Sequence, residues 1–117
     1  MKSSTAVLLF LACVASATAS LALDKPPQFW NLTTSTVTGL EISKPGENAF
    51  QSNQTANDPD GQVEHDERLK ITGVESGTYD VRLTLKDGRT CLVRNVNILK
   101  GKPFSIEDKN LSDCSKR

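Results

Sequence analysis

The sequence predicts an all-β fold, a small antiparallel immunoglobulin-like β-sandwich closed by one disulfide. Three observations support this prediction: apolar residues alternate with polar ones along the second half of the chain, an Asp-Gly turn signal separates two of these runs, and two cysteines remain once an N-terminal export signal is removed. Alternation with a period of two is typical of half-buried strands. No segment shows a sustained helical period. We therefore expect about six or seven short strands in two packed sheets.

The N-terminus has the three-part layout of a secretory signal peptide. Lys2 precedes an apolar run over residues 6–15, and a small-x-small sequence ends at Ala19. The apolar run is too short to span a bilayer comfortably. We expect residues 1–19 to be removed in export, which gives a periplasmic or secreted protein; cleavage after Ala17 or Ala22 is the alternative.

A second interpretation of the same segment is a lipoprotein signal. Residues 10–13 read FLAC, a weak match to a lipoprotein box, and processing there would leave the chain acylated on Cys13. If the ordinary signal is cleaved instead, Cys13 leaves with it, and Cys91 and Cys114 remain as an even pair. In an oxidising compartment these two are expected to form a disulfide. A loop of this length would contribute about 3 kcal/mol to stability in the chain-entropy model.

The composition limits the classes of function. A mature chain of about 98 residues suffices for one small domain, which we place at residues 28–117 after a polar leader at 20–27. The 14 basic side chains balance the 14 acidic ones, so no overall basic field would attract nucleic acid, and no second apolar span would cross a membrane. A catalytic nucleophile-histidine-carboxylate set and a phosphate-binding glycine loop are both missing from the pattern, so we expect no enzyme.

The strands can be placed along the domain. Residues 28–43 are rich in Thr, Val, Ile and aromatics, and Val37 alternates with Leu40 and Ile42 in a period of two. Phe29 and Trp30 are adjacent, so one ring should cap the core while the other is more exposed. Residues 44–67 follow, with Pro, Gly and Asn punctuation and no periodicity. We interpret them as a long connection, a feature that is usually functional or disordered in a small domain.

Strand signals return after this connection. RLKITGV alternates, and GTYDVRLTL places Tyr79, Val81, Leu83 and Leu85 on one face. The KDGR turn predicts a hairpin with TCLVRNVNIL as its second strand. PFSIED is a short last strand, and Cys114 would pin the tail that follows to the hairpin strand that carries Cys91.

Two resemblances accompany this pattern. GVESGTYDVRL resembles the Gly-x-Tyr-x-Val strand start of immunoglobulin-like and fibronectin-like sandwiches, in which the aromatic packs inward, and this implies a fold only. FWNLT, DERLKITGV, YDVRL, GRTC and FSIED together make the chain similar to small exported proteins of alphaproteobacteria, including the lanthanide-binding landiscernin proteins. That resemblance implies a bacterial host and a metal held by acidic side chains.

The connection contains the densest group of carboxylates in the chain. NDPDGQVEHDE, residues 57–67, holds five acids and His65, the only histidine. Hard cations such as Ca²⁺ or a trivalent lanthanide need six or more oxygen ligands, which a flexible acidic loop can supply. Our candidate metal ligands are therefore Asp58, Asp60, Glu64, Asp66 and Glu67.

The same residues match a twelve-residue calcium loop only in part. With Gly61 at the sharp turn, Asp58 and Asp60 fall at positions three and five and Glu67 at the bidentate position twelve, but Ala56 stands where the first ligand should be. Neither flank reads as a helix. The alternative is a solvated connector between strands, in which Arg68 and Lys70 relieve part of the repulsion among the acids.

Two classes of function follow from these observations. The first is a periplasmic hard-cation binding protein, a buffer or carrier for Ca²⁺ or a lanthanide, whose short loop could be completed by a second copy in a homodimer. The second is a metal-free secreted module of β-sandwich type that engages a periplasmic protein partner through a sheet edge or loops.

Overall fold

The structure, a computed structural model, describes residues 25–116, so the predictions for residues 1–19, for Cys13 and for most of the leader lie outside the described residues. Within 25–116 the chain forms seven strands and two short 3-10 helices. In chain order these are β1 (Gln28–Leu32), β2 (Val37–Ser43), η2 (Gln54–Asn57), β3 (Arg68–Lys70), β4 (Gly77–Leu85), β5 (Arg89–Ile98), β6 (Pro103–Glu107), η3 (Asp108–Asn110) and β7 (Ser112–Lys116).

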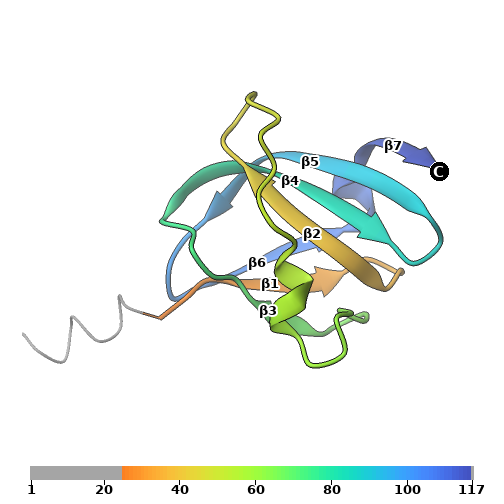
Figure 1. Ribbon diagram of the computed structural model, residues 1–117, viewed down its shortest axis with the longest axis horizontal. Helices are drawn as coiled ribbons and strands as arrows, with labels where there is room; N and C mark the ends of the chain where they lie inside the picture. Colours follow the sequence, from red (N-terminus) through yellow and green to blue (C-terminus); the bar gives the residue numbers. More distant parts are fainter. Residues whose placement is uncertain (1–24, 117) are drawn as a thin grey trace, which may run out of the picture.

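The strands form two sheets, which confirms the predicted all-β sandwich with one disulfide. The first sheet has the order β3-β1-β6 and the second the order β2-β4-β5-β7 (Figure 1). Most neighbouring strands are antiparallel, but β1 and β6 are parallel, with Phe29 opposite Phe104 and Leu32 opposite Glu107. A parallel pair needs a long crossover, and here the whole second sheet except β7 lies between the two strands in sequence.

The core lies between the inward faces of the two sheets. Phe29 of β1 and Phe104 of β6 place their ring centroids 5.8 Å apart at its centre. Alternate residues of β4, in the second sheet, form the opposite layer of the core: Val81, Leu83 and Leu85 are all buried. Trp30 turns to the opposite face and is half-buried, so the two adjacent aromatics divide between core and surface as expected. The remaining fully buried apolar side chains include Leu40, Leu69, Ile71, Ile98 and Ile106.

One detail of the predicted alternation was wrong. The period of two places Val37 on the face opposite Ile42, yet both side chains are buried. The reason is an irregularity in the pairing of β2 with β4 between Val37 and Gly39, which inserts one residue and changes the phase of the strand. Gly39 fits this position because an added Cβ would meet Thr84 Cβ and Oγ1 at 3.0 Å.

The β4–β5 hairpin and its disulfide follow the sequence closely. Asp87 and Gly88 form the turn, with Gly88 at φ +96°, and the Gly88 amide donates to the Leu85 carbonyl at 2.9 Å. Cys91 of β5 is fully buried and bonds to Cys114 of β7 with an S–S distance of 2.04 Å. The predicted tail is therefore a strand, and the disulfide fastens it to the edge of the second sheet.

The long connection 44–67 closes one side of the sandwich. It leaves β2, the edge of one sheet, and returns through η2 to β3, the edge of the other (Figure 1). Asn53 Oδ1 accepts from the Leu40 amide of β2 at 2.9 Å. Gln54 Nε2 donates to the Thr72 carbonyl just after β3, also at 2.9 Å. Amide side chains of the connection thus hydrogen-bond to main-chain groups on β2 and just after β3. Unpaired main-chain groups of an edge strand could otherwise pair with a strand of another molecule.

Candidate functional site

The predicted metal ligands Asp58 and Asp60 lie close together at the start of the acidic loop. Asp58 Oδ2 accepts from the Asp60 amide at 3.3 Å, and Asp60 Oδ1 accepts from the Gln62 amide at 3.0 Å. A hydrogen bond between the two side chains raises the pKa of Asp58 above its ordinary value and lowers the pKa of Asp60. The two carboxyls therefore titrate as an interacting pair.

Two of the other three predicted ligands, Asp66 and Glu67, accept hydrogen bonds elsewhere in the protein, and the third, Glu64, takes part through its main-chain amide. Glu67 Oε1 turns back to accept from the Glu64 amide at 2.8 Å. Asp66 adopts φ +71° and its Oδ1 accepts from the indole N–H of Trp30 at 2.9 Å. The Arg68 guanidinium lies over the same indole, 4.6 Å from the ring centroid. The carboxylates of this half of the loop thus fasten it to β1 and to itself.

The geometry assembles no ready coordination sphere. Within residues 25–116, no three side chains of the His, Cys, Asp and Glu types come together in a group that could hold a metal ion. His65 points away from the acids, and its Nδ1 donates to the Thr33 carbonyl at 2.8 Å. Repulsion among the acids is relieved by main-chain and indole N–H groups of the protein. The set of five metal ligands remains a prediction. Of these five, the structure brings Asp58 and Asp60 together as a pair.

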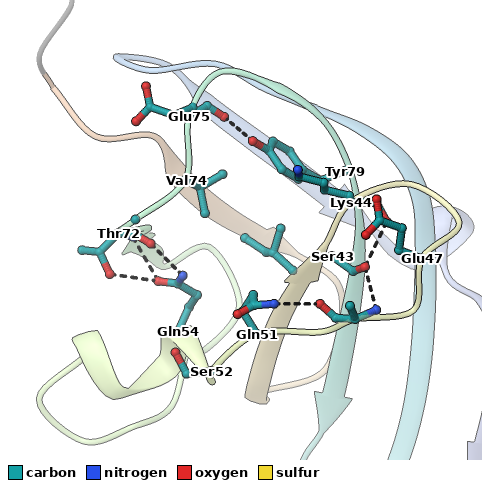
Figure 2. Close-up of a pocket in the computed structure, with 13 residues that line it drawn as sticks. Ser43, Lys44, Glu47, Gln51, Ser52, Gln54, Thr72, Val74, Glu75 and Tyr79 are labelled. Atoms are coloured by element: carbon teal, nitrogen blue, oxygen red, sulfur yellow. Dashed lines mark hydrogen bonds between the residues drawn. The ribbon is translucent and has the colours of Figure 1, made fainter.

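A separate feature, a cleft, lies on the other side of η2. It has a volume of about 520 Å³ and opens between the end of β2, the segment 44–54 and the β3–β4 connection. Figure 2 shows Val74 pointing into it, with Tyr79 above and Gln51 and Gln54 along the opposite wall. Val74 and Tyr79 are only partly buried although they pack against the core. The cleft therefore has an apolar base that remains accessible from outside.

The walls of the cleft are fixed by hydrogen bonds. The Tyr79 hydroxyl donates to the Glu75 carbonyl at 2.8 Å, which sets the ring and the connection that follows β3 (Figure 2). The buried Gln54 both donates to the Thr72 carbonyl and accepts from the Thr72 amide, at 2.9 and 3.0 Å. These hydrogen bonds fix the positions of the two walls relative to each other, although the walls come from distant parts of the sequence.

The third wall is the arm at residues 44–50, and Asp80 holds its base. Asp80 is 2% exposed and accepts from the Gly46 amide at 2.9 Å, from the Asn95 amide at 3.1 Å and from Arg94 Nη1 at 3.2 Å. The hydrogen bond from Gly46 and then that from Asn95 lower the pKa of Asp80 below its ordinary value, and the Arg94 charge adds to this effect. A buried charge on β4 thus ties the arm to β5.

The outward face of the second sheet carries two shallower hollows on either side of Arg82. They measure about 500 and 320 Å³. Arg82 pairs with Glu41 at 2.9 Å and lies over the Phe50 ring, 4.4 Å from its centroid. The guanidinium is thus already partnered on two sides, which makes this face a weaker candidate for a ligand site than the cleft.

The cleft was not predicted from the sequence. Its residues come from three separated segments, and none of them forms a recognisable motif. The only signal was the length of the connection 44–67, which suggested function without locating it. In the described part of the chain, no helix is long and apolar enough to cross a membrane.

Comparisons with known proteins leave this chain without a defined relative. No protein-family model, no characterised protein and no solved structure matches it. The fold and the site therefore define the chain as a small, disulfide-closed β-sandwich with one side cleft, and its resemblance to exported alphaproteobacterial proteins and landiscernin remains a prediction.

Proposed function

We propose that this protein is a metal-free interaction module of β-sandwich type that binds a short segment of a protein partner in the side cleft. The observation that supports it is the combination of an accessible apolar base, formed by Val74 and Tyr79 beside the buried Ile42, with a polar rim of amide and hydroxyl side chains. Protein sites that bind ligands are typically concave and apolar, with a few polar groups that fix orientation. In the acidic loop, in contrast, four of the five carboxylates accept hydrogen bonds from N–H groups of the protein, namely those of Asp58, Asp60, Asp66 and Glu67.

The state of three of the four sheet edges favours the cleft over strand addition; the fourth edge, β7, is exposed and five residues long. The outer edges of β2 and β3 are occupied by the connection 44–67, as described above. On the free side of the first sheet, β6 begins with Pro103, which has no N–H, and the Glu107 amide at its end donates to Asn110 Oδ1 at 2.8 Å. Proline and capped amides make an edge a poor template for another strand. Binding of a partner's side chain in the cleft is thus favoured over addition of a partner's strand to a sheet edge.

The lining residues indicate which segment would fit. One apolar or aromatic side chain would rest on Val74 and Tyr79, with its main chain near Gln51 and Ser52, whose amide and hydroxyl groups can both donate and accept. The rim carries both signs of charge, with Lys44 on one wall and Glu47 and Glu75 as its acids. A mixed rim favours a ligand of low net charge.

Peptide selection tests this proposal. Peptides with one aromatic residue, selected from a random library against the disulfide-intact domain, should shift the amide resonances of residues 42–54 and 72–79. Val74→Glu, at a half-exposed position, should weaken the selected peptides at least tenfold because it places a charge on the apolar base. The matched control, Thr90→Glu in the hollows beside Arg82, should leave binding unchanged. Peptides that bind equally well to Val74→Glu would show that the cleft is not the site.

A second candidate function is hard-cation binding, the first expectation from the sequence. The observation in its favour is the interacting pair Asp58 and Asp60, because a cation would relieve their mutual repulsion. Two carboxyls fill only part of a coordination sphere for Ca²⁺ or a lanthanide, so Glu64, Asp66 and Glu67 would have to turn toward the ion or a second copy would have to supply ligands. The resemblance to landiscernin points in the same direction.

Terbium titration distinguishes the second candidate from the first. Tb³⁺ emission sensitised by Trp30 should appear on titration if the loop binds, because the Trp30 indole donates to Asp66 in that loop. At a hundredfold excess over its Kd the ion should add about 2.7 kcal/mol to the free energy of unfolding. Asp58→Asn with Asp60→Asn should abolish both effects. No emission and no stabilisation at micromolar Tb³⁺ would eliminate this candidate while leaving the cleft untouched.

We also propose that the chain is exported to the periplasm or secreted. The support is the signal-like N-terminus together with the Cys91–Cys114 disulfide, which suits an oxidising compartment. The exported protein should begin at Ser20, and its intact mass should be two hydrogens below that of the reduced chain. A chain that still carries residues 1–19, or one acylated at Cys13, would refute this cleavage.

A further inference from the structure

One end of the sandwich presents an exposed apolar side chain beside lysines. Among the described residues, Leu99 alone is a large apolar side chain that is left exposed, at 38%. It lies in the tight turn between β5 and β6, where the Lys102 amide donates to the Leu99 carbonyl at 3.2 Å and Gly101 takes φ +79°. Lys100 and Lys102 follow Leu99 in this turn. The turn therefore exposes the apolar Leu99 side chain beside two lysines.

Two further lysines lie at the same end of the molecule. The Gln28 amide at the start of β1 donates to the Lys102 carbonyl at 3.2 Å, which places the exposed Lys25 close to the turn. Gln28 also pairs with Lys70 of β3. We define the lysine pole as this turn with its neighbours, namely Lys25, Lys70, Leu99, Lys100 and Lys102.

Two acids border the four lysines of the pole: Asp58 follows Asn57, whose Nδ2 donates to the Lys70 carbonyl at 2.8 Å, and Glu75 pairs with Lys100. Glu75 is the acid paired there, with its Oε2 3.0 Å from Lys100 Nζ, and its side chain is 80% exposed. An ion pair this exposed is weak and exchanges readily with other partners. Three of the four lysines therefore have no ion pair within the described residues, and the pole has a net positive charge that can act on an external anion.

The first described residues lie beside the lysine pole. The Ile71 amide donates to the Pro27 carbonyl beside β3, and the Gln28 amide donates to the Lys102 carbonyl of the turn (Figure 1). The predicted export signal, with its apolar run at residues 6–15, precedes them in the sequence. If that signal is held in a bilayer during export, the lysine pole is the part of the domain nearest to it along the chain.

We propose that the lysine pole is a docking surface for an anionic lipid bilayer. The four lysines attract headgroup phosphates, and each is a compact point charge on a flexible stem, which suits a fluid array of phosphates. Leu99 enters the interface between them, in the manner of an apolar residue on a surface-bound segment. The pole is a projecting turn and not a hollow, so it suits an extended surface better than a single small anion. This surface adjoins the cleft at Glu75, which lines the cleft and pairs with Lys100, but Leu99 and the four lysines of the pole are not cleft residues.

Vesicle binding tests the inference with residues 20–117 alone, so that no apolar anchor contributes. The protein should co-sediment with vesicles of phosphatidylcholine mixed with phosphatidylglycerol, but not with phosphatidylcholine alone, and added salt should weaken binding. Lys25→Gln with Lys102→Gln should lower the partition coefficient by about fivefold per lysine. Leu99→Ser should also lower it, without changing the salt dependence.

The matched control uses two lysines at the other end of the sandwich. Lys86 follows β4 at the hairpin turn, and Lys116 pairs with Arg89 beyond that turn. Lys86→Gln with Lys116→Gln removes the same charge and should leave the partition coefficient unchanged. Equal losses in the two double variants, or equal binding to neutral vesicles, would overturn the proposal. Binding to polyglutamate that matches vesicle binding and ignores Leu99→Ser would assign the pole to an acidic protein instead.

Discussion

Asp80 offers the sharpest test of how the arm beside the cleft is held. Its carboxylate accepts from the Gly46 and Asn95 amides and from Arg94, and only 2% of the residue is exposed. In Asp80→Ala the two amides lose their acceptors, at about 1–3 kcal/mol each. The Arg94 side chain is 43% exposed and can be solvated by water in the variant, so loss of its ion pair with Asp80 adds little to the destabilisation. We expect the free energy of unfolding at neutral pH to fall by about 3 kcal/mol.

The pH dependence of this effect has a definite sign. Because the folded protein lowers the pKa of Asp80, the stabilisation is fully present above the ordinary value of 3.8 and is lost as the pH falls through the lower folded pKa. Urea unfolding should therefore give a constant difference between parent and Asp80→Ala from neutral pH down to about pH 5. Below the ordinary pKa the difference should shrink as Asp80 becomes protonated in the parent.

The control is Asp87→Asn. Asp87 accepts from Arg89 in the exposed hairpin turn, and its pKa is also lowered, but solvent screens it. This variant should change stability little. If Asp80→Ala proved as stable as Asp87→Asn, or if its deficit did not shrink in acid, the assignment of a charged, buried Asp80 as the fastening of the arm would be wrong.

Three further predictions concern the sandwich itself. Replacing Cys91 by Ala and Cys114 by Ser should lower the free energy of unfolding by about 3 kcal/mol and make β7 the first segment to exchange amide hydrogens, since the exposed β7 depends on this bond. Gly39→Ala should cost about 1–3 kcal/mol in thermal unfolding, because the new methyl meets Thr84 at 3.0 Å; an unchanged Tm would contradict the close approach. Asn31→Ala should cost about 3 kcal/mol in urea, because the fully buried amide makes four hydrogen bonds; Thr34→Ala, on the exposed side of the same loop, should cost far less.

The parts of the fold that local patterns encode were predictable. Alternation in β4 from Val81 to Leu85 and the Asp87-Gly88 turn depend on short stretches of sequence, and the pairing of Cys91 with Cys114 follows from the cysteine count; the structure confirms each of them. The inward Phe29 and half-exposed Trp30 follow from the same rule. Such features need only the alternation of side chains across a strand and the preference of glycine for positive φ.

The parts that depend on distant residues were not predictable from patterns. Parallel pairing of β1 with β6 joins segments far apart in sequence, and an inserted residue at Gly39 changes the phase of β2 without a local signal. The acidic loop shows the same limit. Its composition indicated metal ligands, but the indole of Trp30, from another strand, takes Asp66 as its acceptor, and the side chain of Glu67 turns back on the loop.

The parallel pair of β1 and β6 also determines when this chain can fold. β1 ends at Leu32, but its neighbours β3 and β6 end only at Lys70 and Glu107. As the chain emerges N-terminus first, β1 therefore waits for most of the remaining sequence, and closing so long a loop is slow. The β4–β5 hairpin, in contrast, is complete within one local segment. A sandwich with this connectivity cannot complete its first sheet until β6 has emerged, which is late in the synthesis of the chain.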